Sequence, residues 1–334
     1  MTPTVVIQSK QGIGDVVWHL PYVRAIAAAS PGGKVVFLAL PSTYAKELLA
    51  EEPCIERTVY FESRGSELKR ILHQARLVGI LRNLHCHTAW FLDRTVRPAI
   101  AALFARIPNR IGVGLGPQRW FITNRGVDPG THRDDPYPFK WLDELMAQMK
   151  LPIVTTEPNL QLPTAPIAAV RGKFAAHARP WVVLGLGGSH PLKQWPEPTW
   201  VEFVAGLRKQ LPGTVFLIGG ATQTPQAMEL MTRTAGAPAV DATGLSLIEA
   251  AALLREADLF VGPDSGPMNL AAAVGTPAFA MFGATRVLTY SKYIHPILPD
   301  DGGAPTLHGM ARISAANVLA RIVPYLETHG TSRG

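Results

Sequence analysis

The sequence is poor in cysteine and has no long apolar run. It contains two cysteines, Cys54 and Cys86, among 334 residues, too few for a disulfide framework or a four-ligand zinc site. A membrane-spanning helix needs roughly 20 apolar residues, and the longest nearly apolar run, residues 270–284, is shorter and is interrupted by glycine and proline. The start, MTPTVVIQSKQG, lacks the features of a signal peptide. We therefore expect a soluble cytoplasmic protein.

Several familiar functional motifs are absent as well. Neither GxGxxG nor GxxxxGK[ST] occurs, which argues against a standard dinucleotide dehydrogenase and a P-loop ATPase. The absence of HExxH, GxSxG and His/Cys clusters excludes metalloproteases and serine hydrolases. Few aromatic residues are interleaved with the basic ones, and no RNA-binding or helix-turn-helix pattern is present, so no nucleic-acid partner is expected. We predict neither a metal site nor a cofactor.

The composition and length are those of a folded protein with two domains. The chain is 47% hydrophobic and 17% charged, and 334 residues exceed what one core usually supports. Strand-like and helix-like patterns alternate in both halves, which indicates parallel sheets. We expect two Rossmann-like α/β domains, residues 1–160 and 161–334, facing each other across a cleft, with a proline-rich linker at residues 152–169.

The individual elements can be placed from the same patterns. Strands are predicted at residues 4–7, 34–40, 110–113, 181–186, 215–218, 259–261 and 278–282. Helices are predicted at residues 16–26 (with Pro21 either kinking the helix or lying in its first turns), 44–50, 68–81, 97–104, 139–149, 199–210, 247–255 and 268–274. A last helix at about residues 311–326 can pack on either domain.

Positive charge is concentrated in one stretch of the first half. Residues 64–125 contain eleven Lys or Arg residues and two acids, a net charge of +9, whereas the whole chain carries +7. This asymmetry points to an anionic partner, either a phosphorylated substrate or a membrane surface. The alternative is an ordinary solvated basic surface.

The strongest local signal is VGPDSGPMNLAAA, residues 261–273. A strand ends, an Asp-Ser-Gly turn follows, and a helix of small residues begins. The free N–H groups and the dipole at such a helix start suit a phosphate or diphosphate. The alternative is that Asp264 or Ser265 only caps the helix.

Two further glycine loops follow predicted strands. In GGSHPLKQWP, residues 187–196, Lys193 could reach the same anion as a point charge, or could be a solvated loop lysine. In GIGD, residues 12–15, Asp15 is a carboxylate at a helix start, where a capping role is the alternative. Ligands of open parallel sheets bind at such strand ends.

Together these segments resemble family 9 glycosyltransferases, the ADP-heptose:lipopolysaccharide heptosyltransferases. The matching segments are GIGDVVWHLPYVRAI (residues 12–26), RIGVG (110–114), LKQWPEPTW (192–200), LSLIEAAALL (245–254) and GPDSGPMNLAAAVGTP (262–277). The resemblance implies a GT-B fold with the acceptor on the N-terminal side and the nucleotide sugar on the C-terminal side. It also implies metal-independent transfer with inversion, from ADP-heptose to an anionic glycolipid, in peripheral contact with the cytoplasmic face of the inner membrane.

The resemblance also suggests roles for individual residues. Asp15 matches the catalytic base, and Lys193 the lysine on the donor diphosphate; Arg94 and Arg97 are candidates for binding the acceptor's anionic groups. The donor-binding residues that it implies are Ser189, Lys193, Thr222, Gln223, Leu245, Asp264, Ser265, Gly266, Pro267, Met268 and Asn269.

The sequence departs from the family pattern at two donor positions. Asn269 stands where most members carry a histidine, and the loop after Gly219 and Gly220 lacks the glutamate that binds the ribose, which Thr222 or Gln223 could replace. These departures leave two other functions open. One is a non-catalytic protein of the same fold that binds a nucleotide sugar or phosphoglycan, and the other is a glycosyltransferase for a different nucleotide sugar.

Overall fold

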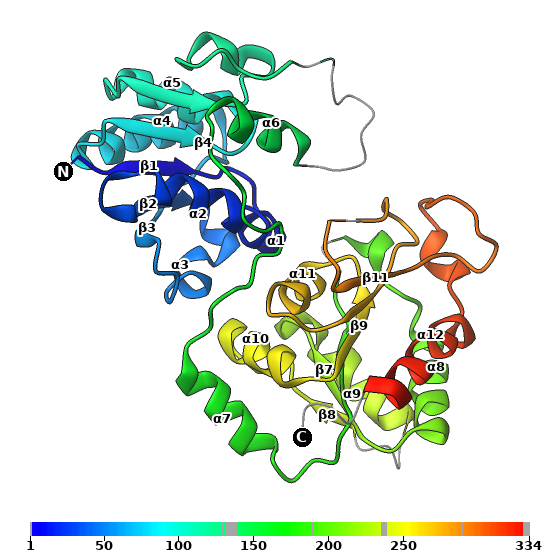
Figure 1. The fold of residues 1–334 in the computed structure, drawn as a ribbon. Coiled ribbons are helices and arrows are strands. Elements are labelled where there is room, and N and C mark those ends of the chain that lie inside the picture. Colours follow the sequence, from blue (N-terminus) through cyan, green and yellow to red (C-terminus); the bar gives the residue numbers. More distant parts are fainter. Residues whose placement is uncertain are drawn as a thin grey trace. The chain divides into compact units, whose positions relative to one another are not determined.

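The computed structural model describes residues 2–128, 130, 139–188, 190–234, 239–288 and 290–329. The chain divides into two compact units, Met1–Gln161 and Leu162–Gly334. Each unit is built on one parallel β-sheet with helices packed against it (Figure 1). No helix of the described residues is long and apolar enough to cross a membrane.

The first unit contains a five-stranded sheet in the order β3-β2-β1-β4-β5, with all pairs parallel. Its strands are β1 (Thr4–Ile7), β2 (Val35–Ala39), β3 (Ile55–Tyr60), β4 (Thr88–Phe91) and β5 (Asn109–Gly112), and its helices are α1 (Ile13–Val17), α2 (Leu20–Ala28), α3 (Ala45–Leu48), α4 (Glu67–Asn83), α5 (Val96–Phe104) and α6 (Lys140–Gln148). The central strand is β1, whose Val5 and Ile7 pack with Leu77 and Leu81 of α4 in one core.

The second unit contains a six-stranded parallel sheet in the order β11-β10-β9-β6-β7-β8. Its strands are β6 (Trp181–Gly185), β7 (Thr214–Ile218), β8 (Ala239–Asp241), β9 (Leu259–Pro263), β10 (Ala278–Met281) and β11 (Ile294–Ile297), and its helices are α7 (Thr164–Phe174), α8 (Glu197–Gln210), α9 (Thr224–Arg233), α10 (Leu247–Glu256), α11 (Gly266–Ala273) and α12 (Ala315–His329).

The last helix, α12, belongs to the core of the second unit. Its Val318 and Ile322 are fully buried in the cluster that contains Phe203 of α8. The two helices approach closely at Gly206, where an added Cβ would lie 2.6 Å from Leu319 Cδ1. The absence of a side chain at Gly206 therefore allows α12 to seat against α8.

Two predicted features require correction, and several elements were not predicted. The helix predicted at residues 16–26 is two helices, α1 and α2, because Pro21 lacks an N–H and is accommodated in the first turn of a new helix. The segment predicted as a linker, 152–169, ends in α7, whose first turn accommodates Pro166 and whose Val170 and Phe174 are buried. The pattern also missed β3, β4, β8, β11 and α9.

The strand order places a switch point in each sheet. In the first sheet β1 lies between β2 and β4, and in the second β6 lies between β7 and β9. The chain therefore runs from β1 to β2 on one side and from β4 to β5 on the other. In the second sheet it runs from β6 to β7 on one side and from β9 to β10 on the other. Ligands of doubly wound sheets bind at the carboxyl ends of strands at such points.

Candidate active site

At the switch point of the second sheet, Lys193 meets Asp264. Lys193 follows β6 and ends a short 3₁₀ helix, Pro191–Lys193, and Asp264 follows β9 directly. The ammonium Nζ donates to Asp264 Oδ2 at 2.7 Å and to the Asp264 carbonyl at 3.2 Å. The Thr285 hydroxyl donates to the same carboxylate oxygen at 3.0 Å. The pair is mostly buried, and the solvated-lysine interpretation is therefore wrong in this structure.

The next residue, Ser265, begins α11 but does not cap it with its side chain. Its backbone is extended and its side chain accepts no hydrogen bond from the helix. The residue is only 5% exposed, and its Oγ has no hydrogen-bond partner within the described part of the chain. A buried hydroxyl without a partner beside free helix N–H groups is a ready donor for an anionic oxygen.

The remaining residues of this turn differ in their exposure. Gly266 and Pro267 form the first turn of α11 and are half-buried, whereas Met268 is fully buried. Asn269 donates from Nδ2 to the Ser265 carbonyl at 2.8 Å. The Asn269 amide therefore stabilises this turn. The family resemblance places a histidine at this position in most members.

The loops after β7 and β8 hold the other predicted donor residues. Gln223 Oε1 accepts a hydrogen bond from the Gly220 N–H at 2.9 Å, so this oxygen supports its own loop. Thr222 is exposed, and Leu245 is half-buried just before α10. Ser189 lies outside the described residues.

In the first unit, Asp15 lies in the first turn of α1, after the loop that follows β1. Its Oδ2 accepts from the Gly12 N–H at 3.1 Å, so the predicted capping contact is present. Its Oδ1 lies 3.9 Å from Lys10 Nζ, and a third of the side chain is exposed. The cap uses one carboxylate oxygen and leaves the other directed to a basic, solvent-accessible surrounding.

A buried carboxylate that the sequence analysis missed fixes the loop of Asp15. Asp93 follows β4, and its two oxygens accept from the Ser9 N–H at 2.6 Å and the Thr95 N–H at 2.7 Å. Its carbonyl accepts from Gln118 Nε2 at 2.7 Å. Asp93 thereby joins the loops that leave β1 and β4 at the switch point.

His19 contacts the backbone carbonyl of Asp15. A carbonyl oxygen only accepts hydrogen bonds, so the short contact between His19 Nδ1 and the Asp15 carbonyl requires the proton on Nδ1. The ring is buried, and this burial lowers the pKa of His19. His19 is therefore the neutral Nδ1–H tautomer that fixes the backbone of Asp15.

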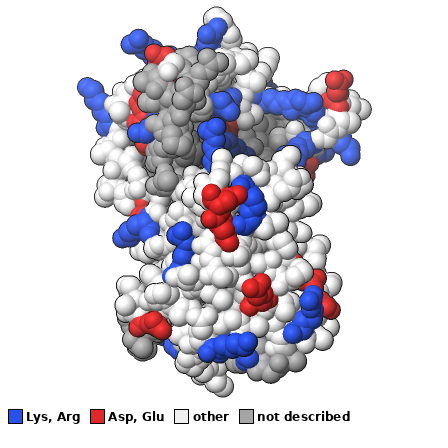
Figure 2. All heavy atoms as spheres, turned by 90° about the vertical axis from the view of Figure 1, so that its right-hand side faces the viewer, with Lys and Arg blue, Asp and Glu red and all other residues white. Residues whose placement is uncertain are grey.

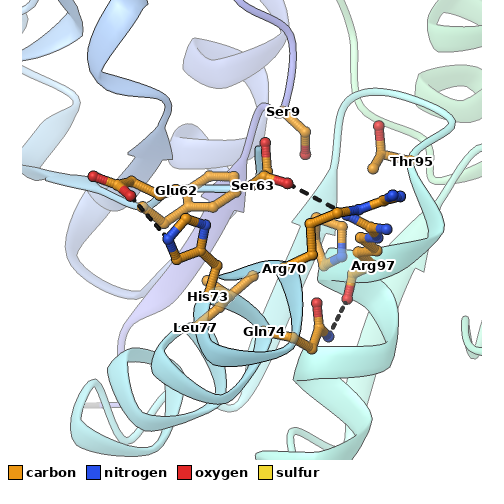
Figure 3. A pocket seen from close by; sticks show the side chains of 11 residues that line it. Ser9, Glu62, Ser63, Arg70, His73, Gln74, Leu77, Thr95 and Arg97 are labelled. Atoms are coloured by element: carbon orange, nitrogen blue, oxygen red, sulfur yellow. Dashed lines mark hydrogen bonds and ion pairs between the residues drawn. The ribbon is translucent and has the colours of Figure 1, made fainter. Parts of the chain in front are cut away.

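The basic stretch forms a small pocket next to the loop of Ser9 (Figure 3). Arg97 and Arg70 extend toward the same side of it, and Arg97 Nη1 donates to the Ser63 carbonyl at 3.3 Å. Within the part of the chain that the structure describes, neither arginine pairs with a carboxylate. The pocket measures about 20 Å³, so it admits a single small group rather than a whole sugar.

Arg94, the other predicted acceptor residue, has a different environment. Its side chain is exposed, and its guanidinium lies over the Trp141 ring, 5.1 Å from the ring centre. It does not line the pocket of Arg97. Lys and Arg side chains are visible at several places in the upper half of Figure 2. Among the described residues, no group of three or more His, Cys, Asp or Glu could hold a metal ion.

Comparisons with known proteins agree on fold and family. The chain is 24% identical to lipopolysaccharide heptosyltransferase 2 of Salmonella typhimurium over 81% of this chain and 80% of that protein. Its fold is similar to that of the E. coli ADP-heptose lipopolysaccharide heptosyltransferase II, with a TM-score of 0.76, 21% identity and 98% and 99% of the two chains covered. It is also similar to E. coli heptosyltransferase WaaC with ADP-2-deoxy-2-fluoro heptose, with a TM-score of 0.74, 17% identity and 97% and 99% covered.

The expected GT-B fold of two parallel-sheet domains is thereby confirmed. The sequence pattern of glycosyltransferase family 9 (heptosyltransferase) matches residues 90–297. These residues include Arg97, Lys193 and Asp264, whereas Asp15 precedes them. Since the match spans more than half of the chain, this protein belongs to glycosyltransferase family 9, the heptosyltransferases.

Proposed function

We propose that the chain transfers heptose, with inversion at the anomeric carbon, from ADP-heptose to the phosphorylated core of a lipopolysaccharide. The second unit, residues 162–334, binds the nucleotide sugar, and the first unit, residues 1–161, binds the acceptor. The observation that carries this proposal is the ion pair of Lys193 and Asp264 after the ends of β6 and β9, followed by Ser265, whose hydroxyl has no hydrogen-bond partner among the described residues. In support, the related Salmonella protein is a lipopolysaccharide heptosyltransferase, and the E. coli protein of similar fold is an ADP-heptose lipopolysaccharide heptosyltransferase.

On the donor side, positive charge and N–H groups face the leaving diphosphate. Lys193 supplies a cation, and the start of α11 supplies backbone N–H groups and the helix dipole. Ser265 donates its hydroxyl to a phosphate oxygen. Gly266, Pro267 and Asn269 shape the turn, Met268 supports it from the interior, and Thr222, Gln223, Leu245 and Ser189 complete the donor site.

On the acceptor side, Asp15 acts as the general base. Its carboxylate takes the proton of the acceptor hydroxyl while that oxygen forms a bond to the anomeric carbon. The bond from this carbon to the diphosphate oxygen breaks, and ADP leaves with the electron pair. The Gly12 N–H holds one oxygen of the Asp15 carboxylate, and the other oxygen, 3.9 Å from Lys10 Nζ, is the one that takes the proton.

The acceptor's anionic groups bind the basic stretch. The pocket of Arg97 and Arg70 takes one phosphate or carboxylate group, and Arg94 contacts the glycan outside it. Since the acceptor is a glycolipid, the enzyme works in peripheral contact with the cytoplasmic face of the inner membrane.

The test is a panel of ADP-, GDP- and UDP-sugars, each incubated with a lipopolysaccharide core acceptor. We expect ADP release and a heptosylated acceptor with ADP-heptose alone. Tight ADP binding without release of ADP from any donor would instead identify a non-catalytic binding protein of the same fold. Release of GDP or UDP would assign a different donor.

A further inference from the structure

Three large apolar side chains are exposed together on the first turns of α4. Leu68, Ile71 and Leu72 expose 69%, 66% and 50% of their surface. Their i, i+3, i+4 spacing places them on one helix face. Single exposed apolar residues are ordinary, but a cluster on one face marks an interaction surface. We call these three residues the apolar stripe.

The opposite face of the same turns lines the acceptor pocket. Arg70, His73 and Gln74 have the same spacing, and all three line the pocket of Figure 3. Residues two positions apart on an α-helix point about 200° away from each other. Because each member of this set follows a member of the apolar stripe by two positions, one helix carries a pocket-lining face, whose His73 Nε2 lies 3.0 Å from Glu62 Oε2, and an apolar face back to back.

The charges around the apolar stripe select its partner. Lys69, Arg76 and Arg82 are exposed on α4, Arg64 is exposed just before it, and Glu67 is the single acid of the helix. Exposed apolar side chains flanked by Lys and Arg are typical of helices that lie in the interface of an anionic bilayer. The same charges would repel a second copy of this basic surface.

We propose that the apolar stripe docks the enzyme on a bilayer with anionic headgroups. The apolar side chains enter the acyl boundary, and the flanking basic side chains contact lipid phosphates. This inference deepens the proposed function and rests on it for one point, that the acceptor is a glycolipid. An acceptor with its acyl chains in that bilayer then presents its anionic sugars to the pocket on the other face of α4.

The experiment measures binding of the full chain to sedimented vesicles. The variant Leu68→Gln/Ile71→Gln/Leu72→Gln keeps good helix formers on α4. The control, Met228→Gln/Leu307→Gln, removes side chains that are 62% and 67% exposed in the second unit. On phosphatidylglycerol-containing vesicles we expect the triple variant to lose at least tenfold in affinity, which is about the effect of no longer burying one apolar side chain. The control should lose none. Vesicles of phosphatidylcholine alone bind the wild type more weakly.

Two results would overturn the docking surface. One is equal binding of the triple variant and the wild type to anionic vesicles. The other is a wild-type dimer that the triple variant converts to a monomer, with vesicle binding unchanged, because the stripe would then join two copies. If the triple variant loses helical circular dichroism, the single Ile71→Gln replaces it, with a smaller expected loss.

A second assay separates this inference from the proposed function. Transfer of heptose to a deacylated core acceptor, without vesicles, tests catalysis alone, and there the triple variant should match the wild-type kcat/KM. If neither protein transfers heptose but the vesicle difference is present, the docking surface stands and the proposed function fails. If transfer is normal in both and the vesicle difference is absent, the docking surface fails and the proposed function stands.

Discussion

The ammonium group of Lys193 donates to both the carboxylate and the backbone carbonyl of Asp264, at 2.7 and 3.2 Å. The two residues come from the loops after β6 and β9, neighbouring strands whose connections diverge. The glycine loop before Lys193 packs tightly on it, since a Cβ at Gly188 would lie 2.9 Å from Lys193 Cβ. Asp264 therefore holds the lysine at the strand ends and also offsets part of its charge.

This pairing predicts a non-additive effect on nucleotide binding. Lys193→Ala removes a charged donor and leaves the mostly buried Asp264 carboxylate facing the diphosphate, so ADP affinity should fall about ten- to hundredfold. In Lys193→Ala/Asp264→Asn the repulsive charge is also gone, and ADP should bind more tightly than to Lys193→Ala. Calorimetric titration of the wild type, Lys193→Ala, Asp264→Asn and the double variant measures the coupling. Equal affinities for the single and double variants would show that Asp264 exerts no such repulsion.

The sequence revealed the strands that read as continuous apolar runs and the loops that follow them. Thr4–Ile7 and Trp181–Gly185 are fully buried strands of this kind. It did not reveal β4, because Thr88–Phe91 has a single β-branched residue, whereas all four residues of Thr4–Ile7 are β-branched. Asp93 was missed for a related reason, since its contact with Ser9 joins positions 84 residues apart. Such partners are set by strand order, which no local pattern records.

The candidate site shows the same limit. The family resemblance implied Lys193 and Asp264 separately as donor contacts, but their mutual ion pair depends on β6 lying beside β9. Arg70 was counted as one basic residue among eleven, and its place beside Arg97 follows from the packing of α4 on α5. Local sequence patterns therefore predict the fold class and the functional loops. The partners of each side chain depend on tertiary packing, which local patterns do not show.

Asp15→Asn tests the general base with little change in structure. The asparagine carbonyl still accepts from the Gly12 N–H, so the start of α1 should be retained. It cannot take a proton, and kcat should fall by at least ~10²-fold while ADP affinity is unchanged. Steady-state kinetics, calorimetry and a thermal melt are needed together. Turnover near the wild-type rate would reduce Asp15 to a helix cap.

His19 predicts a loss of stability in acid. Burial lowers its pKa in the folded state, so the unfolded chain takes up a proton that the folded chain refuses. The contribution to stability is complete above the unfolded pKa of about 6.5 and is lost as the pH falls below it. Urea unfolding measures the free energy of unfolding at each pH. Between about pH 8 and about pH 5 this free energy should fall more steeply for the wild type than for His19→Asn, which keeps a donor for the Asp15 carbonyl. Parallel curves would contradict a buried neutral His19.

Chelation tests the metal-independent mechanism. Lys193 and the N–H groups of α11 can neutralise a diphosphate without a divalent cation. Added EDTA should therefore change neither the rate of heptose transfer nor the affinity for ADP. A rate that collapses with EDTA and returns with Mg²⁺ or Mn²⁺ would overturn this mechanism.

Replacing the arginines of the basic stretch one at a time should separate an anion-binding pocket from a solvated surface. Arg97 and Arg70 share the pocket, whereas Arg94 lies over Trp141 outside it. We expect Arg97→Ala and Arg70→Ala each to raise the acceptor KM about tenfold or more, since each removes a charged hydrogen bond to the bound anion. Arg94→Ala should raise it less, because exposed charges are screened over about 8 Å at physiological ionic strength.

The control in this series is ADP affinity, which should be the same in all three variants because the donor residues belong to the second unit. Since both pocket arginines would contact one anion, Arg70→Ala/Arg97→Ala should cost less than the product of the two single effects. A solvated basic surface predicts instead that the three variants have the wild-type acceptor KM. That outcome, with thermal melts unchanged, would remove Arg70 and Arg97 from the acceptor site, and the anionic groups of the acceptor would then have to bind elsewhere on the first unit.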